Sequence, residues 1–144
     1  MKCILFLCSG NYYRSRFAEE YFNHLADKLG SVWRADSKGL YQDLSFLQNI
    51  GSISTFTIKE LERRGLLCKN HNRGPISVSD DDFSKYDHYV AMDKDEHYPM
   101  IERLFPHMDA AIEYWDIKDI GFEDPLSACE RIVRNIEILI EKLV

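Results

Sequence analysis

The sequence has 144 residues, of which 45% are apolar and 29% charged, and its formal net charge is −6. A chain of this length and composition is expected to fold as a single domain over residues 1–144, without a disulfide or a metal to stabilise it. The longest apolar run, Cys3 to Cys8, is far shorter than the ~20 residues of a membrane-spanning helix, so no membrane association is expected. Four cysteines in no paired spacing and no targeting signal predict a cytoplasmic protein.

The charge is distributed unevenly along the chain. Residues 1–76 carry 11 basic and 7 acidic side chains, whereas residues 77–144 carry 7 basic and 17 acidic ones. The net acidity argues against general nucleic-acid binding, and the N-terminal half is the half that attracts anions. An acidic C-terminal half is equally well explained as a solvated surface.

Predicted strands and helices alternate along the chain. The apolar run Lys2–Cys8 predicts a strand buried on both faces, and a helical stripe follows from Ser15 until Gly30 ends it. The alternation predicts an α/β fold, a doubly wound four-stranded parallel sheet with helices on both faces. The other predicted elements are strands at Val32–Ser37, Tyr86–Asp93 and Ala110–Trp115, and helices at Thr57–Gly65, at Lys94–Leu104 and after a capping box at Ser127–Glu130.

The segment Lys38–Thr55 has no firm periodic pattern, and 18 residues is long for a connection. We interpret it as a candidate for a mobile wall of a binding site. Tyr41 and Phe46 in this segment either line an aromatic entrance or pack the segment onto the protein.

The loop after the first strand carries the chemistry. Cys8 is followed by five residues and Arg14, and Ser15 then opens a helix. Loop N–H groups and a helix N-terminus form a cradle for an anion such as phosphate, and the guanidinium of Arg14 can hold two of its oxygens. Cys8 is expected to be a thiolate nucleophile, stabilised by Ser15. The residues assigned to phosphate binding and loop support are Ser9, Gly10, Asn11, Tyr12, Tyr13 and Ser15.

A phosphate ester also needs an acid that protonates the leaving oxygen. The predicted acid is Asp124, which stands before Pro125 at the start of the terminal helix. The alternative is structural, because a carboxylate at that position can stabilise the helix N-terminus. The acidic run Asp93–His97 is interpreted in the same way, as the start of a helix, and no metal site is expected there.

These residues resemble the low-molecular-weight protein tyrosine phosphatase family, which has a Cys-x5-Arg-Ser loop after its first strand and a catalytic Asp-Pro pair near the C-terminus. Cys8–Ser15 and Asp124-Pro125 match those motifs. Asp36–Leu40, His71–Arg73 and Tyr86–Asp93 are similar to further segments of the family. The resemblance implies a small sheet of four parallel strands and a two-step reaction through a phosphocysteine, without a metal or other cofactor.

The resemblance also implies a role for each matched residue. Cys8 attacks phosphorus, and Arg14 and the loop amides bind the phosphoryl oxygens. Asp124 protonates the leaving group and then activates water. Asn11 maintains the shape of the loop, and Ser15 stabilises the thiolate. The expected partners are a phosphorylated protein or a small aryl phosphate, with phosphate or another oxyanion in the loop.

Four residues depart from the family pattern. Tyr13 stands where many members have a second loop cysteine, so no protective loop disulfide can form. Tyr12 replaces a smaller residue at the mouth of the pocket, and Arg16 replaces a proline and adds a charge beside the cradle. Leu126 stands where aromatic residues are frequent. We therefore expect Tyr12, Tyr41 and Leu126 at the substrate rim, without a defined substrate.

The main hypothesis is a phosphotyrosine phosphatase, and three alternatives remain. A protein-arginine phosphatase belongs to the same family. A thioredoxin-coupled arsenate reductase shares the fold but needs two further cysteines close together, whereas Cys68 has no neighbour. The third alternative is a phosphate-binding module without turnover, against which the joint presence of Cys8, Arg14 and Asp124 argues. The sequence does not predict the oligomeric state.

Overall fold

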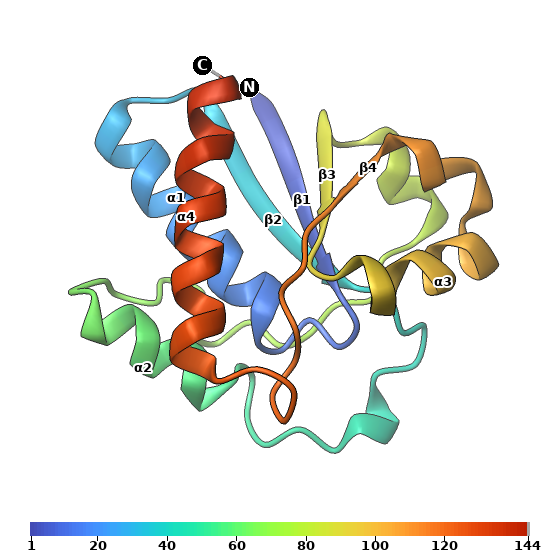
Figure 1. The fold of residues 1–144 in the computed structure, drawn as a ribbon, viewed down its shortest axis with the longest axis horizontal. Coiled ribbons are helices and arrows are strands. Elements are labelled where there is room, and N and C mark those ends of the chain that lie inside the picture. Colours follow the sequence, from blue (N-terminus) through green and yellow to red (C-terminus); the bar gives the residue numbers. More distant parts are fainter. Residues whose placement is uncertain (144) are drawn as a thin grey trace.

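In the computed structural model of the protein, residues 1–143 are described, and Val144, the last residue of the predicted domain, lies outside the described residues. The chain forms a sheet of four parallel strands in the order β2-β1-β3-β4 (Figure 1). This arrangement confirms the predicted α/β fold. The strands are β1 (Lys2–Cys8), β2 (Trp33–Gly39), β3 (His88–Ala91) and β4 (Ile112–Tyr114).

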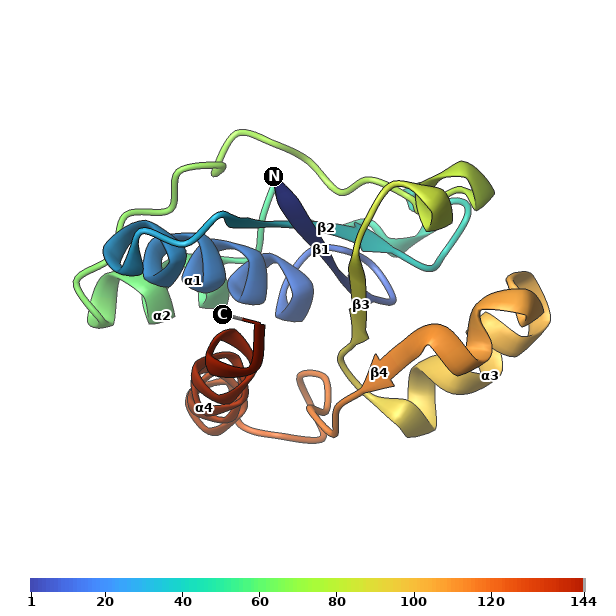
Figure 2. The same ribbon diagram turned by 90° about the horizontal axis from the view of Figure 1, so that it is seen from above.

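The central strand β1 is buried on both faces because helices cover both. Ile4 and Phe6 belong to an apolar cluster that includes residues of α1 and α4, whereas Leu5 and Leu7 belong to a second cluster with residues of α3. In Figures 1 and 2, α1, α2 and α4 gather together and α3 lies apart from them, beside β4. The helices are α1 (Arg14–Leu29), α2 (Thr55–Arg63), α3 (Lys94–Leu104) and α4 (Pro125–Leu143).

The helix ends correct two sequence predictions. Helix α1 ends as predicted at Gly30, which has a left-handed φ of 64°. Helix α2 begins before Thr57, since Ser54 is its N-cap and accepts a hydrogen bond from the Phe56 N–H. Helix α4 also begins earlier than the predicted capping box, at Pro125. None of the helices in residues 1–143 is long and apolar enough to cross a membrane.

The carboxyl ends of β1 and β2 meet at one edge of the sheet. Cys8 pairs with Gly39 in the strand register, and the N–H groups of Leu40 and Tyr41 donate to the carbonyls of Cys8 and Ser9. A Cβ on Gly39 would lie 2.9 Å from the Ser9 carbonyl oxygen. The loop that follows β1 therefore rests directly on the end of β2, and glycine is required there for this close approach.

Candidate active site

The loop between β1 and α1 brings the predicted nucleophile and its serine together. Cys8 is only 3% exposed, and its Sγ lies 2.9 Å from the Ser15 Oγ. The Asn11 Nδ2 donates a hydrogen bond of 2.9 Å to the same Ser15 Oγ. Because the serine oxygen already accepts from Asn11, its own hydrogen is available to donate to the Cys8 sulfur, as a thiolate requires.

Asn11 maintains the curvature of this loop. Its φ of 49° is left-handed, a conformation that asparagine tolerates better than most residues. The buried side chain donates to Ser15 and Ser37, and its Oδ1 accepts from the Arg73 Nη1 and from the Ile76 N–H, both at 3.0 Å. Each polar atom of the amide is thus occupied, which gives Asn11 the loop-supporting position that the sequence predicts.

Behind Asn11 lies a buried ion pair that the sequence reasoning did not identify. The Arg73 Nη2 lies 2.8 Å from the Glu19 Oε1, and the Ser37 hydroxyl donates to the same carboxylate oxygen. Burial raises the pKa of Glu19 above its ordinary value, although Ser37 and Arg73 act against that rise. The only sequence signal for this pair was the weak match of His71–Arg73 to a family segment.

The guanidinium of Arg14 lies beside Cys8 and is only 2% exposed. Its Nη1 donates to the Ile117 carbonyl at 2.9 Å, and both terminal nitrogens lie 3.0 Å from oxygens of Glu96. Burial works against the charge of Arg14, but the Cys8 and Glu96 charges outweigh it and raise its pKa. Arg14 therefore remains a cation at the floor of the pocket.

Two polar residues of the first turn of α3 reach the loop, and neither was predicted as part of the site. The Ser9 hydroxyl donates to Glu96, and its oxygen lies 3.1 Å from the Nε2 of His97. Burial lowers the pKa of His97, which is fully buried, so its ring is neutral at neutral pH. The sequence reasoning had assigned this stretch only to a helix start.

The predicted acid Asp124 and a second carboxylate, Asp119, lie in different places relative to the pocket. Asp119, which follows β4, lines the same pocket as Cys8, and its Oδ2 lies 3.6 Å from the Arg14 Nη2. The predicted acid Asp124 is exposed and does not line that pocket. Its Oδ2 accepts from the Ser127 N–H at 3.2 Å, which is the helix-capping alternative.

A short turn presents Asp119 to the pocket. The N–H groups of Phe122 and Glu123 both donate to its carbonyl, and Gly121 has a φ of 95°, which favours glycine. The Asp119 Oδ1 also accepts from the Ile120 N–H. The sequence signal for this turn is an aspartate two residues before a glycine, after the last strand, and it is weaker than the Asp-Pro dipeptide at Asp124.

The pocket has a cavity of about 330 Å³ with an aromatic mouth. The Tyr12 hydroxyl donates to the Ile50 carbonyl, and Tyr41 packs edge-on against Phe46 with ring centroids 5.1 Å apart. Leu126 is not among the lining residues, so it does not contribute to the rim there. The residues that line the cavity are Cys8, Ser9, Gly10, Tyr12, Tyr13, Arg14, Tyr41, Leu47, Asn49, Glu96, Asp119 and Ile120.

Arg16 lies beside the loop, with its Nη1 3.5 Å from the Asn11 carbonyl oxygen, but it is not among the residues that line the pocket. Its side chain is 1% exposed, and it donates to the carbonyls of Ser52, Asn70 and Arg73. The buried guanidinium satisfies backbone groups of two segments that would otherwise lose their hydrogen bonds. Arg16 therefore joins those segments to α1 instead of binding an anion.

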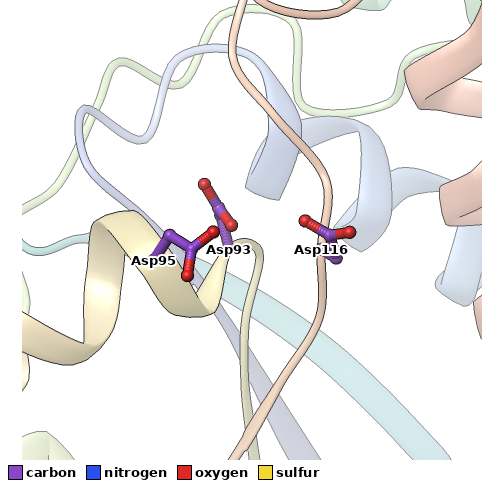
Figure 3. Close-up of side chains that lie close together, drawn as sticks. All are labelled: Asp93, Asp95 and Asp116. Atoms are coloured by element: carbon purple, nitrogen blue, oxygen red, sulfur yellow. The ribbon is translucent and has the colours of Figure 1, made fainter.

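Three carboxylates lie close together between the start of α3 and the segment after β4, as Figure 3 shows. Asp93 and Asp95 come from the start of α3, and Asp116 comes from the segment after β4. The Lys118 ammonium lies 2.8, 3.0 and 3.1 Å from Asp93, Asp95 and Asp116 respectively. This single cation offsets part of the negative charge of the cluster and connects α3 to the segment that carries Asp119.

Comparison with known proteins gives a match to one family. A family described as low molecular weight phosphotyrosine protein phosphatase matches residues 3–144. Among the curated protein sequences searched, none matches this chain.

Several solved structures are similar to this chain, among them the following three. A low molecular weight protein tyrosine phosphatase from T. tengcongensis is 23% identical over 99% of both chains, with a TM-score of 0.81. YfkJ from Bacillus subtilis is 25% identical, over 99% of this chain and 94% of its own, with a TM-score of 0.84.

The third is a Cys-to-Ser mutant of the arginine phosphatase YwlE, a Bacillus subtilis protein, whose active-site serine is phosphorylated. It is 16% identical over 98% of this chain and 95% of its own, with a TM-score of 0.80. These likenesses support the fold, and the family match extends over nearly the whole chain. The resemblance noted in the sequence is thereby confirmed, and the chain belongs to the low molecular weight phosphotyrosine protein phosphatase family.

Proposed function

We propose that this protein is a metal-independent phosphomonoester hydrolase that uses Cys8 as its nucleophile and acts on protein phosphotyrosine. One observation carries the proposal. The Cys8 Sγ lies 2.9 Å from a serine hydroxyl, in a cavity that Arg14 and Asp119 also line. This set supplies a nucleophile, a cation for the phosphoryl oxygens and an acid within one pocket.

The reaction proceeds in two displacements. The Cys8 thiolate attacks phosphorus, the bond from phosphorus to the ester oxygen breaks, and that oxygen takes a proton from Asp119. The Asp119 carboxylate then removes a proton from water, whose oxygen attacks phosphorus as the bond to sulfur breaks and the thiolate is restored. Phosphorylation of the serine that replaces the nucleophile in the YwlE mutant supports a covalent intermediate of this kind. Asp119 takes the role first assigned to Asp124 because only Asp119 lines the pocket.

The shape and composition of the mouth support phosphotyrosine as the substrate. Tyr12 and Tyr41 line the cavity, and aromatic walls pack favourably against a phenyl ring. Phosphoarginine is the second candidate, since Glu96 and Asp119 also line it and carboxylates complement a guanidinium. Arsenate reduction is less well supported, because burial raises the pKa of Cys68 to about 12 and keeps it a thiol.

Hydrolysis of p-nitrophenyl phosphate in the presence of a chelator tests the proposal. We expect turnover that survives the chelator, disappears in Cys8→Ser and persists in Cys3→Ser, the matched control on the same strand. Turnover that requires a metal, or that persists in Cys8→Ser, contradicts the proposal. A phosphate-binding module would instead bind phosphate without turnover. Phosphotyrosine and phosphoarginine peptides, compared by kcat/KM, then distinguish the two substrate classes.

A further inference from the structure

Glu96 makes two separate sets of contacts at the edge of the pocket. On one side, its two carboxylate oxygens each lie 3.0 Å from a terminal nitrogen of Arg14. On the other side, it accepts a hydrogen bond from the Ser9 hydroxyl. The carboxylate is 31% exposed and lines the cavity, so it is close to the space that a phosphoryl group would occupy.

His97 fixes the direction of the hydrogen bonds that reach Glu96. The His97 Nδ1 accepts from the Asp93 N–H at 3.0 Å, so the neutral ring carries its hydrogen on Nε2. That Nε2 lies 3.1 Å from the Ser9 oxygen and 3.3 Å from Glu96. Ser9 therefore accepts from His97 and donates to Glu96, and the carboxylate receives donors from both sides.

The protonation of Glu96 agrees with this arrangement. Burial raises the pKa of a carboxyl group, but the hydrogen bonds from His97 and Arg14 outweigh burial and hold the pKa of Glu96 well below its ordinary value. Glu96 is therefore an anion over the pH range in which a phosphatase is assayed. An anion with its oxygens on both terminal nitrogens restricts the rotation of the guanidinium.

We propose that Glu96, oriented by Ser9 and His97, is a positioning residue that holds the Arg14 guanidinium in place for the transferred phosphoryl group. This inference rests on the proposed function. Arg14 binds oxygens whose charge and geometry change during transfer, and a donor that is already oriented stabilises the transition state more than one that must first be ordered. Glu96 itself touches no reacting atom, so its effect reaches the reaction through Arg14.

A carboxylate so close to a phosphate site could also act against binding, as a competitor that occupies Arg14 and repels the substrate. The two roles predict opposite results for Glu96→Gln, which removes the charge and keeps the shape. A positioning role predicts a lower kcat, whereas a competing role predicts tighter phosphate binding with an unchanged kcat. Glu102→Gln is the matched control, since Glu102 is an exposed carboxylate on the same helix.

The first experiment measures kcat and KM for p-nitrophenyl phosphate and inhibition by phosphate and vanadate. We expect kcat of Glu96→Gln to fall about tenfold with KM within about twofold, less than the ~100-fold for removing a donor outright. Inhibition by vanadate, which mimics the transition state, should weaken more than inhibition by phosphate. An unchanged kcat, or equal weakening of both inhibitors, would overturn the proposal.

Ser9→Ala supplies a second variant, which keeps the buried His97 and alters only one hydroxyl. We expect a loss of kcat of several-fold in the native background and almost none in Glu96→Gln, because both changes act through Arg14. Independent, multiplying effects would refute the connection between Ser9 and Glu96.

Alkylation of Cys8 by iodoacetamide separates failure of this inference from failure of the proposed function. Protection by phosphate and by vanadate reports anion binding without turnover. If the native protein binds these anions but does not hydrolyse esters, the proposed function fails. The Glu96 proposal is then still tested by whether Glu96→Gln weakens protection by vanadate more than protection by phosphate. If vanadate and phosphate protect Cys8 in Glu96→Gln as well as they do in the native protein, the Glu96 proposal is rejected.

Discussion

The floor and the mouth of the pocket are held by different kinds of contact. The floor, defined here as the loop Cys8–Ser15 without the Tyr12 side chain, is stabilised by buried hydrogen bonds centred on Asn11. The mouth is formed by segments near Tyr41 and Asp119, which are partly or fully exposed, and the Asp119 carbonyl and carboxylate accept hydrogen bonds from the turn that follows. The floor is thus built as a rigid anion site, whereas the mouth depends on the position of segments distant in sequence.

The comparison shows that residues contiguous in the chain form the anion site, whereas segments distant in sequence form the mouth that contacts the substrate. A strand, a five-residue connection and a helix N-terminus are contiguous in the chain, so their geometry follows from local structure. The acid and the Arg14-orienting carboxylate come from the ends of other strands and reach the loop only through the sheet topology. Changes in the mouth are therefore expected to alter proton transfer and positioning, and changes in the floor to abolish anion binding.

The largest effect is expected for the acid at the mouth. Asp119→Asn should lower kcat by about 10²- to 10⁴-fold for esters with poor leaving groups and much less for activated aryl esters, because only poor leaving groups need a proton. Asp124→Asn is the matched control and should leave kcat unchanged at both kinds of ester, since its carboxylate bonds Ser127. A loss of kcat in Asp124→Asn that depends on the leaving group would restore Asp124 as the acid.

The close approach of β2 to the floor predicts the next effect. A methyl group on Gly39 would lie 2.9 Å from the Ser9 carbonyl oxygen and 3.2 Å from Asn11, so Gly39→Ala must displace the loop. We expect about a 100-fold loss of kcat/KM and weaker phosphate binding, measured by calorimetry. Gly74→Ala is the control, because nothing lies within 4 Å of its added Cβ. Unchanged phosphate affinity in Gly39→Ala would show that the floor is not rigid.

The support behind the floor is testable through stability. Arg73→Met leaves the Glu19 carboxylate buried without its partner, at a cost of about 3 kcal/mol in the free energy of unfolding by urea. Protonation removes the unpaired charge, so the difference from the native protein should shrink as the pH falls from 7 toward 5. The double variant Glu19→Gln with Arg73→Met should recover part of the loss. If the difference in the free energy of unfolding between Arg73→Met and the native protein grew at low pH, Glu19 would not be a buried anion.

A smaller effect is expected where the mouth is joined to α3. Lys118 contacts three carboxylates and precedes the acid, so Lys118→Met should release the Asp119 segment and remove the cation that the three carboxylates share. We expect kcat to fall about tenfold, mainly for poor leaving groups. Lys94→Met is the control, because Lys94 is exposed at the start of the same helix. Equal losses in the two variants would attribute the effect to net charge alone.

The sequence predicts best the part of the fold whose residues follow one another directly in the chain. The strand β1, the loop and the start of α1 follow from an apolar run that gives way to a helical period, and Gly30 ends α1 as expected. The order of strand and helix along the chain was also correct. The predicted starts of α2 and α4 were less accurate. Several serines, threonines and acidic residues stand in succession near Ser54 and Asp124, and each can accept a hydrogen bond from the first N–H groups of a helix.

The part of the site that sequence did not predict depends on tertiary contacts. Glu96 and His97 were assigned only to the start of a helix, whereas the structure places both against Ser9 of the loop after β1. Asp119 has no dipeptide signature and depends on a glycine turn for its placement. The buried course of Arg16 toward carbonyls at Ser52 and Asn70 likewise cannot be inferred from its neighbours in sequence.

The most direct measurement of the central claim is the chemical identity of the trapped intermediate. The protein is mixed with a rapidly cleaved aryl phosphate, quenched in acid within the first turnover, digested and mapped by mass spectrometry. The account predicts a phosphoryl group on the peptide that contains Cys8, on sulfur, formed in the native protein and accumulating when water attack is slowed in Asp119→Asn. A phosphoryl group on another residue, or hydrolysis with no covalent intermediate in either protein, would contradict it.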